Sequence, residues 1–332
     1  MTTGREASGP AQAAGPPYPM FPGVGIPTFL RSPHVSDLSE LDADIVVLGV
    51  PTDEGSPYKP GSRFAPRAIR EHSLRLCAGG AGFFDPETGK SYLEHEQRNR
   101  RIVDGGDVPI LPTNVAATFE CITDSVQRAV SQSVMPVLLG GDHAIPYPIV
   151  RGFDEPLHVF QFDAHLDYEP FSHGLEMTNG HAFRHIAQMP HVESLTSIGI
   201  RSIRNPKSTI EESLAHGNRI VTMEQYAAGG LDLILGDVPE GAACYVTIDI
   251  DVLDMSLVPG CMSAEPNGMS YVALRDALNV LAERTRIVGF DLCEVNPLLD
   301  VATGVTSYLA TYTIVEFLGR ICAQPHYHER VR

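Results

Sequence analysis

Three short apolar runs in this chain each end in aspartate or histidine. The runs are a few residues long and rich in β-branched and aromatic side chains, which predicts buried strands. Each run is followed directly by side chains that can bind a metal ion. Residues 136–139 precede Gly140, Gly141, Asp142 and His143. Residues 158–162 precede Asp163, His165 and Asp167, and residues 245–248 precede Asp249 and Asp251.

The polar residues after these runs form a candidate metal site. In an extended chain residues i, i+2 and i+4 lie on one face, so we expect Asp163, His165 and Asp167 to converge at the end of their strand. Carboxylate oxygens suit hard divalent ions, and imidazole suits borderline ones. One such stretch would equally fit a solvated strand exit, but three together predict two ions bridged by shared carboxylates. The six predicted ligands are His143, Asp163, His165, Asp167, Asp249 and Asp251.

Strand patterns and helix patterns alternate along the whole chain. Alternation of this kind predicts an α/β fold, with a mostly parallel sheet and helices on both faces. Ligands of such sheets bind at the carboxyl ends of the strands, which is where all three polar stretches fall. Further strands are expected at 44–50, 101–104, 195–200, 219–222 and 287–292, and helices at 113–131 (capped by Thr113 or Asn114), 145–153, 271–284 (capped by Ser270) and 306–321.

Length and composition narrow the class of protein. The 332 residues fit one α/β catalytic domain over 23–332, preceded by a flexible arm over 1–22 that is rich in Gly, Ala and Pro. A formal net charge of −17 argues against a nucleic-acid partner, which needs a basic face. The chain has neither an apolar run near 18 residues nor a secretory signal, so no membrane association is expected. Six cysteines without a CxxC pair predict a reduced, cytoplasmic protein.

Five motifs together resemble the ureohydrolases, the arginase/agmatinase family. The resemblance extends over about residues 21–321, and the stretches 21–35 and 60–70 look more like the agmatinase and guanidinobutyrase branch than like arginase proper. It implies a three-layer α/β/α fold, a binuclear manganese site (nickel in some members), and trimers or hexamers. The motifs are Gly-Gly-Asp-His at 140–143, Asp-Ala-His-Leu-Asp at 163–167, Ser-Ile-Gly-Ile-Arg at 197–201, Asp-Ile-Asp-Val-Leu-Asp at 249–254 and Gly-Phe-Asp-Leu-Cys-Glu-Val-Asn-Pro at 289–297.

The resemblance also implies a reaction and a distribution of ligands. Family members hydrolyse a guanidino group to urea and an amine by attack of a metal-activated hydroxide on the guanidinium carbon. Carried over by motif, Glu294 would hold the guanidinium and Asp167 would pass a proton to the leaving amine. One ion would take His143, Asp163, Asp167 and Asp249, and the other Asp163, His165, Asp249 and Asp251.

One motif departs from the family pattern at the position of a catalytic histidine. Many members carry His-Gly-x-Pro-Phe after the Asp-x-His-x-Asp loop, and that histidine assists proton transfer. Aligned on Gly180 and Phe183, its place is taken by Asn179, and His181 lies two residues later. We expect His181 to act as the proton shuttle and Asn179 to contact the substrate. The alternative is that Asp167 transfers the proton alone.

Departures around the expected pocket leave the substrate open. The family's Gly-Thr-rich stretch is replaced at 258–269 by a segment with Cys261 and Met262, and the loop 53–59 is unusual. The first hypothesis is a hydrolase of an agmatine- or guanidinobutyrate-type compound, forming a homohexamer or another homo-oligomer. The second is a hydrolase, with nickel as its metal, of free guanidine or a substituted biguanide such as metformin. The third is a non-catalytic subunit of the same fold, and a hetero-oligomer with a related subunit also fits the sequence.

Overall fold

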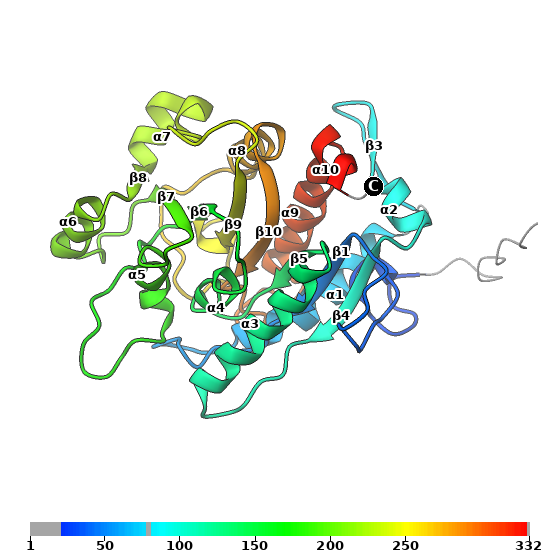
Figure 1. Ribbon diagram of the computed structural model, residues 1–332, viewed down its shortest axis with the longest axis horizontal. Helices are drawn as coiled ribbons and strands as arrows, with labels where there is room; N and C mark the ends of the chain where they lie inside the picture. Colours follow the sequence, from blue (N-terminus) through cyan, green and yellow to red (C-terminus); the bar gives the residue numbers. More distant parts are fainter. Residues whose placement is uncertain (1–20, 78–80, 331–332) are drawn as a thin grey trace, which may run out of the picture.

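Eight strands form one sheet in the order β4-β1-β5-β10-β9-β6-β7-β8 (Figure 1). The computed structural model describes residues 21–77 and 81–330. Every pairing between these eight strands is parallel, as predicted. The strands are β1 (Ile45–Gly49), β4 (Ile102–Asp107), β5 (Met135–Leu139), β6 (Leu157–Phe162), β7 (Val192–Ile200), β8 (Arg219–Thr222), β9 (Ala243–Asp249) and β10 (Arg286–Cys293).

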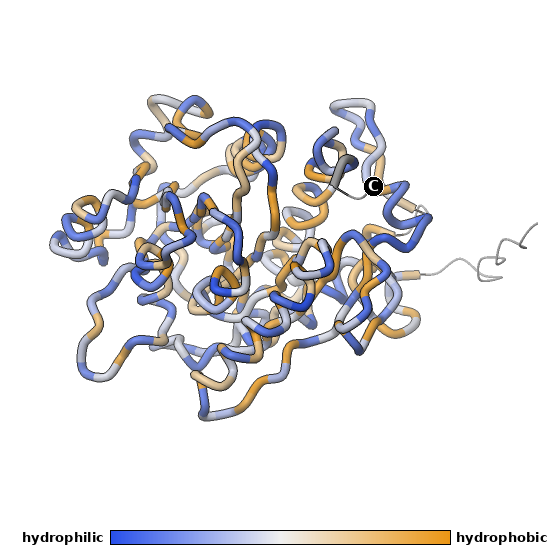
Figure 2. Tube along the Cα trace, in the orientation of Figure 1, coloured by the Kyte–Doolittle hydropathy of each residue, from blue (hydrophilic) through white to orange (hydrophobic). Residues whose placement is uncertain are grey.

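Helices cover both faces of this sheet. Alternate residues of β1 point to opposite sides, with Ile45 and Val47 in one hydrophobic cluster and Val46 and Leu48 in the other. This confirms the predicted three-layer α/β/α arrangement, and Figure 2 shows hydrophobic stretches along β10 and α9. The first cluster is covered by α1 (Ala65–Ser73), α7 (Met223–Gly229), α8 (Tyr271–Arg284) and α9 (Val305–Cys322), the second by α3 (Val115–Ser131), α4 (Pro146–Val150) and α5 (Ala182–Ile186).

Two helix starts follow the predicted capping chemistry. The Asn114 side chain accepts a hydrogen bond from the amide of Ala117 at 3.1 Å. The Ser270 hydroxyl accepts one from the amide of Ala273 at 3.2 Å. Such caps satisfy amide groups that have no partner within the helix, which is why both helices begin at the next residue.

Several short elements were not among the sequence expectations. They are three to nine residues long, and patterns of this length carry little periodic signal. They are β2 (Phe83–Asp85) and β3 (Lys90–Tyr92), which pair with each other, the helices α2 (Glu94–Arg98), α6 (Lys207–Ala215) and α10 (Pro325–Arg330), and the 3-10 turns η1 (Phe29–Arg31), η2 (Ser62–Phe64), η3 (Leu74–Leu76), η4 (Asn179–His181), η5 (Gly230–Leu233) and η6 (Ile250–Val252).

The strands that carry the predicted ligands are neighbours in the middle of the sheet. Their order is β5-β10-β9-β6, and parallel pairing brings their carboxyl ends to one edge. Residues 1–20, most of the predicted arm, lie outside the described part of the chain. Over residues 21–77 and 81–330, no helix is both long enough and apolar enough to cross a membrane.

Candidate metal centre

The first group of predicted ligands lies between the ends of β5 and β6. His143 follows β5, and its Nδ1 lies 2.9 Å from Asp163 Oδ2 and 3.1 Å from Asp167 Oδ2. His143 and Asp163 are fully buried, and the Asp167 side chain is only 14% exposed. One imidazole nitrogen and two carboxylate oxygens therefore point at the same space.

A second group shares Asp163 with the first. The His165 Nδ1 lies 3.0 Å from Asp251 Oδ2 and 3.5 Å from Asp163 Oδ1. The two oxygens of Asp163 thus face different histidines, Oδ2 toward His143 and Oδ1 toward His165. Asp249, like Asp163, lies near both groups. Its Oδ2 lies 3.5 Å from His143 Nδ1, and one of its oxygens lies within 4.8 Å of an oxygen of Asp251. These are the positions that bridging carboxylates need.

The local backbone differs from the extended chain that the sequence pattern suggested. Strand β6 ends at Phe162, and the chain then bends, with the His165 amide donating to Asp163 Oδ1 at 2.6 Å. Asp167 has a left-handed backbone, with φ of 47°. The prediction that 163, 165 and 167 converge holds, but the reason given for it was wrong. A turn, rather than one face of a strand, directs these side chains to two adjacent groups.

Left-handed backbone occurs at a second residue of this region. Glu294, the residue directly after β10, has φ of 65°. Non-glycine residues avoid this conformation, and it persists where the surrounding structure enforces it, often at functional sites. Glu294 is held because its amide donates to Gly141 O at 2.9 Å and its Oε1 accepts from the His143 amide at 2.9 Å.

Crowding of buried charge sets the electrostatics of the centre. Burial opposes ionisation of Asp163, but hydrogen bonds with His143 and His165 outweigh it and hold the pKa of this carboxyl below its usual range. Burial, together with the charges of Asp251 and Asp163, raises the pKa of Asp249 well above its usual value. Burial also works against a charged His165, yet Asp251 raises its pKa to about 11. A bound cation would relieve the repulsion among these carboxylates.

The donor set fits two divalent ions. Across residues 21–77 and 81–330, no lysine or arginine forms an ion pair with Asp163, Asp167, Asp249 or Asp251. Buried carboxylates are rarely left without a cationic partner or a metal. Oxygen and imidazole donors suit manganese-type ions. This cluster of buried carboxylates, which among the described residues pairs with two histidines but with no lysine or arginine, is therefore the feature of this structure that calls for metal.

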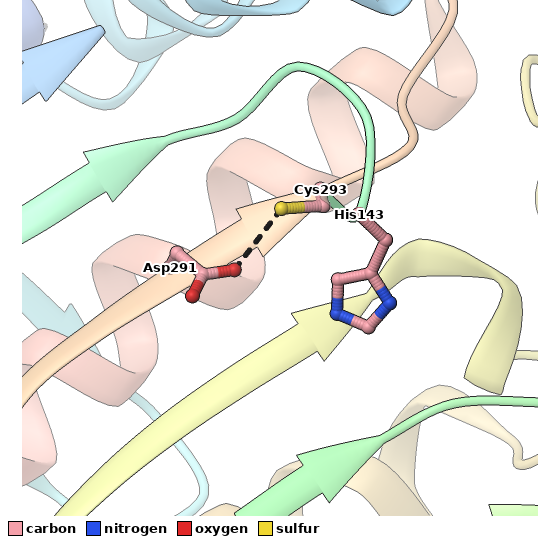
Figure 3. A group of neighbouring side chains, drawn as sticks. All are labelled: His143, Asp291 and Cys293. Atoms are coloured by element: carbon pink, nitrogen blue, oxygen red, sulfur yellow. Dashed lines mark hydrogen bonds between the residues drawn. The ribbon is translucent and has the colours of Figure 1, made fainter. Parts of the chain in front are cut away.

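A buried network behind His143 fixes its orientation. The His143 Nε2 lies 2.9 Å from Thr247 Oγ1, which in turn donates to Asp291 Oδ1 at 2.9 Å. The Tyr245 hydroxyl donates to the other oxygen of Asp291. Figure 3 shows the Cys293 sulfur directed at the same carboxylate, to which it donates at 3.1 Å. Asp291 thus supports His143 through hydrogen bonds, with its own oxygens already occupied.

Sequence reasoning missed the residues that support the ligands from behind. Gln161 is fully buried, and its Nε2 donates to Asp163 Oδ2 at 2.8 Å and to His165 O at 3.1 Å. Thr247 was likewise counted only as part of an apolar run. The signal that could have identified both residues is that each is a polar side chain inside a run that is otherwise suited to a buried strand. Because buried polar groups need hydrogen-bond partners, such a side chain indicates a polar neighbour.

A cavity of about 250 Å³ opens above the two groups. Glu294 lies in its wall, and burial followed by the charge of Asp142 raises the pKa of this carboxyl to about 8. The lining combines ligand residues, further polar side chains and two apolar ones. It consists of Pro57, His165, Asp167, Glu169, Asn179, Gly180, Arg204, Asn205, Asp249, Met262, Ser263 and Glu294.

Asn179 and His181 take different places relative to the cavity. Asn179 lines it, in the position where the family pattern has histidine. His181 is buried at the foot of α5, with its Nδ1 2.6 Å from Thr178 Oγ1. Burial lowers the pKa of His181 below its usual value, and a hydrogen bond with the backbone of Pro170 opposes that shift. A proton-transfer role for His181 would require its ring to leave Thr178, and this role stays a prediction.

Two arginines near the centre have structural partners. Arg201 donates to backbone carbonyls of the following loop, including Asp251 O at 2.7 Å and Glu265 O at 2.9 Å. Arg204 Nε donates to Glu265 Oε1 at 3.0 Å, and Arg204 Nη2 lies 2.6 Å from His165 Nε2. Arg201 therefore ties the 251–265 segment to β7, and the charge of Arg204 is balanced by Glu265.

Comparison with known proteins agrees with this geometry. The sequence model of the Arginase family matches residues 43–319. Proclavaminate amidinohydrolase of Streptomyces clavuligerus is 33% identical over 303 residues, covering 88% of this chain and 92% of the relative. Guanidinobutyrase of Pseudomonas aeruginosa is 30% identical over 307 residues, covering 89% and 92% of the two chains.

Solved structures share the fold. Proclavaminate amidinohydrolase superimposes with a TM-score of 0.77 at 29% identity, over 90% of this chain and 98% of that one. A formiminoglutamase of Trypanosoma cruzi, solved with Mn2+2, gives a TM-score of 0.75 at 20% identity, over 86% and 95% of the chains. The sheet, the cluster of buried carboxylates and these matches lead to one conclusion. The chain belongs to the arginase family, and it is a metal-dependent ureohydrolase, an enzyme that hydrolyses guanidino compounds.

Proposed function

We propose that this enzyme hydrolyses a guanidino compound of the agmatine or guanidinobutyrate type to urea and an amine. The observation that carries the proposal is the position of Glu294, in the wall of a cavity that is also lined by three of the six predicted ligands, His165, Asp167 and Asp249. A planar cation held by Glu294 would place its central carbon over the two groups of ligands.

The residues that would hold the ions are those named from the sequence. His143, Asp163 and Asp167 form one group, and Asp163, His165 and Asp251 form the other, with Asp249 reaching both. Two divalent ions bound there would lower the pKa of a bound water and so supply the nucleophile. Manganese is the first choice for this donor set, and nickel is the alternative.

Glu294 is suited to binding a guanidinium. Its carboxylate is buried, and among the described residues only Oε1 has a hydrogen-bond donor, the amide of His143. The other oxygen remains for an N–H group of the substrate. Hydrogen bonds between a carboxylate and a guanidinium are charge-assisted and stronger than neutral ones.

Proton transfer to the leaving amine is assigned first to Asp167. Its side chain lines the cavity, and burial together with the charge of Asp163 raises its pKa to about 6. Asn179 lines the same cavity and offers amide donors and an acceptor to the substrate. His181 would join this step if its ring turned from Thr178 toward the cavity.

The cavity wall favours one kind of substrate tail. Glu169 lines the cavity, and within residues 21–77 and 81–330 no side chain forms an ion pair with its carboxylate. Arg204 also lines the cavity, but its charge is balanced by Glu265. A substrate with a cationic tail, such as agmatine, would therefore complement the charge of the cavity wall better than a substrate with an anionic tail.

A second candidate substrate is free guanidine or a substituted biguanide such as metformin, with nickel as the metal. The supporting observation is the size and composition of the cavity. Its volume of about 250 Å³ lies below the ~300–1,000 Å³ usual for drug-sized ligands. Pro57 and Met262 add apolar surface to it. A small or alkylated guanidine would fit such a space.

Urea release from a panel of substrates separates these candidates. The panel contains agmatine, guanidinobutyrate, arginine, free guanidine and metformin, each assayed with metal-free protein reloaded with Mn²⁺ or with Ni²⁺. We expect the highest kcat/KM for agmatine with Mn²⁺. Turnover of guanidine or metformin alone, with Ni²⁺, would replace the first candidate by the second. Absence of urea from every substrate with either metal would contradict both.

A further inference from the structure

A buried thiol lies beside the metal centre on the side of the second group of ligands. The Cys261 sulfur and one oxygen each from Asp249 and Asp251 all lie within 4.8 Å of one another, and all three residues are buried. Asp251 also belongs to the group with Asp163 and His165. The sulfur is therefore next to the position of the ion that these aspartates would hold.

The backbone holds this sulfur in place. The Cys261 amide donates to Val258 O at 3.1 Å, and Cys261 forms an isolated antiparallel bridge with Val295, the residue after Glu294. The amide of Asn296 donates to Gly260 O at 2.6 Å. Although Cys261 follows β9 by twelve positions in a loop, its backbone is thus fixed to the end of β10.

The two cysteines near the centre differ in what their sulfurs contact. The Cys293 sulfur donates to Asp291 at 3.1 Å and points toward that carboxylate in Figure 3. The Cys261 sulfur has a weak contact with Ser263 Oγ at 3.8 Å. Cys261 is therefore the thiol that is available to a metal ion, and Cys293 offers a natural comparison.

We propose that Cys261 is a soft ligand of the ion held by Asp163, His165, Asp249 and Asp251, and that it raises the affinity of this position for thiophilic divalent ions such as Zn²⁺ or Co²⁺ while leaving its affinity for Mn²⁺ little changed. The inference rests on the metal centre proposed above. On binding, the S–H bond breaks, a sulfur–metal bond forms, and the proton passes to solvent. No change of oxidation state is involved.

Geometry and ligand chemistry both support this role. With metal–sulfur and metal–oxygen distances of ~2.3 and ~2.1 Å, two donors of one tetrahedral zinc ion lie ~3.6 Å apart. The sulfur and the aspartate oxygens already lie within 4.8 Å of one another, so a side-chain movement of about 1 Å would complete the site. Thiolates favour zinc and other soft or borderline ions, whereas carboxylates suit manganese. A site of oxygen and imidazole donors with one sulfur therefore discriminates among metals differently from one without sulfur.

Cobalt loading of the full chain tests the inference directly. Metal-free protein is titrated with cobalt chloride and its absorption is recorded, since thiolate ligation adds a near-ultraviolet charge-transfer band to the visible bands of Co²⁺. We expect the band in the wild type and in Cys293→Ala, and its loss in Cys261→Ser. If Cys261→Ser fails to fold, Cys261→Ala replaces it, and the wild-type spectrum remains informative by itself.

Competition between metals gives a second readout. Cys261→Ser should lower Zn²⁺ affinity by ~10-fold or more, the lower bound even for loss of an outer partner, and should change Mn²⁺ affinity by less than ~3-fold. Two bound cobalt ions without the charge-transfer band, or a band that survives in Cys261→Ser, would overturn the inference and leave the metal centre standing. Protein that binds no cobalt would overturn both.

Discussion

The floor and the rim of the active-site cavity are built in different ways. The floor is the cluster of predicted metal ligands together with Glu294. His165, Asp167, Asp249 and Glu294 line the cavity, and His143, Asp163 and Asp251 are fully buried in contact with this lining. The rim consists of loop residues such as Pro57, which is exposed, and Glu169 and Met262, which are half-buried. The sheet positions the floor, so in the function proposed above the floor determines the reaction. The rim depends on loop conformation and would determine which guanidine enters.

The floor and the rim also differ in how neighbouring residues hold their carboxylates. Each floor carboxylate has hydrogen-bond partners within the protein, such as Gln161 Nε2 at 2.8 Å from Asp163 Oδ2 and Ser263 Oγ at 3.0 Å from Asp251 Oδ2. On the rim, Glu169 is fixed through its backbone, whose amide donates to Gly180 O at 2.7 Å, while its carboxylate is left for solvent or substrate. Substitutions on the floor should therefore abolish the reaction, and substitutions on the rim should change its selectivity.

Removing a bridging carboxylate from the floor should have the largest effect. Asp163→Ala deletes the group that faces both histidines, so we expect loss of bound metal together with loss of activity by ~10³-fold or more, since metal catalysis supplies several kcal/mol. Metal analysis and urea release measure the two quantities. Asp232→Ala, an exposed aspartate of η5, is the matched control and should keep both. Full metal content and activity in Asp163→Ala would refute the floor as the site of catalysis.

His181→Ala tests whether a residue outside the floor takes part in proton transfer. If His181 is the proton shuttle, as predicted from the sequence, kcat should fall by ~10²-fold with metal content unchanged. Thr178→Val is an informative companion, because it removes the hydroxyl 2.6 Å from the His181 ring without removing the ring. Near-wild-type turnover in His181→Ala would instead assign the proton transfer to Asp167.

Glu294→Gln changes the floor at the substrate rather than at the metal. The amide keeps the shape of the side chain but loses the charge that assists the guanidinium hydrogen bond. A hydrogen bond to a charged group is worth ~1.5–3 kcal/mol, so kcat/KM should fall by roughly 10-fold or more while metal remains bound. Steady-state kinetics with parallel metal analysis measure this. Unchanged kinetics would exclude Glu294 as the guanidinium anchor.

The floor could be predicted from the sequence because its signal is local. The ligands follow runs that are themselves recognisable as strands, such as 158–162 before Asp163, and parallel pairing then brings strand ends together. Local backbone was harder to predict. The left-handed conformation of Glu294 is held by contacts with Gly141 and His143, which are distant in sequence. The left-handed Asp167 likewise has a distant backbone partner, because its carbonyl oxygen accepts from the Phe183 amide at 3.2 Å.

The rim and the supporting residues could not be predicted for a related reason. Glu169 and Met262 line one cavity although they are far apart in the chain, and no periodic pattern in the sequence predicts that they lie close together. The position of Cys261 beside Asp249 and Asp251 depends on the bridge to Val295. Tertiary contacts decide which residues line the cavity or support the ligands, and a single sequence does not display these contacts.

The smallest expected effect belongs to the rim, in the variant Glu169→Gln. A partly exposed charge pair contributes ~0.2–1 kcal/mol, so KM for agmatine should rise by at most ~5-fold, with kcat and metal content unchanged. The KM for guanidinobutyrate should stay the same or fall, because its anionic tail no longer meets a like charge. Glu176→Gln removes the same charge from an exposed loop position outside the cavity and should alter neither KM. Equal changes for both substrates would show that Glu169 does not recognise the tail, and a fall in kcat would place Glu169 with the floor.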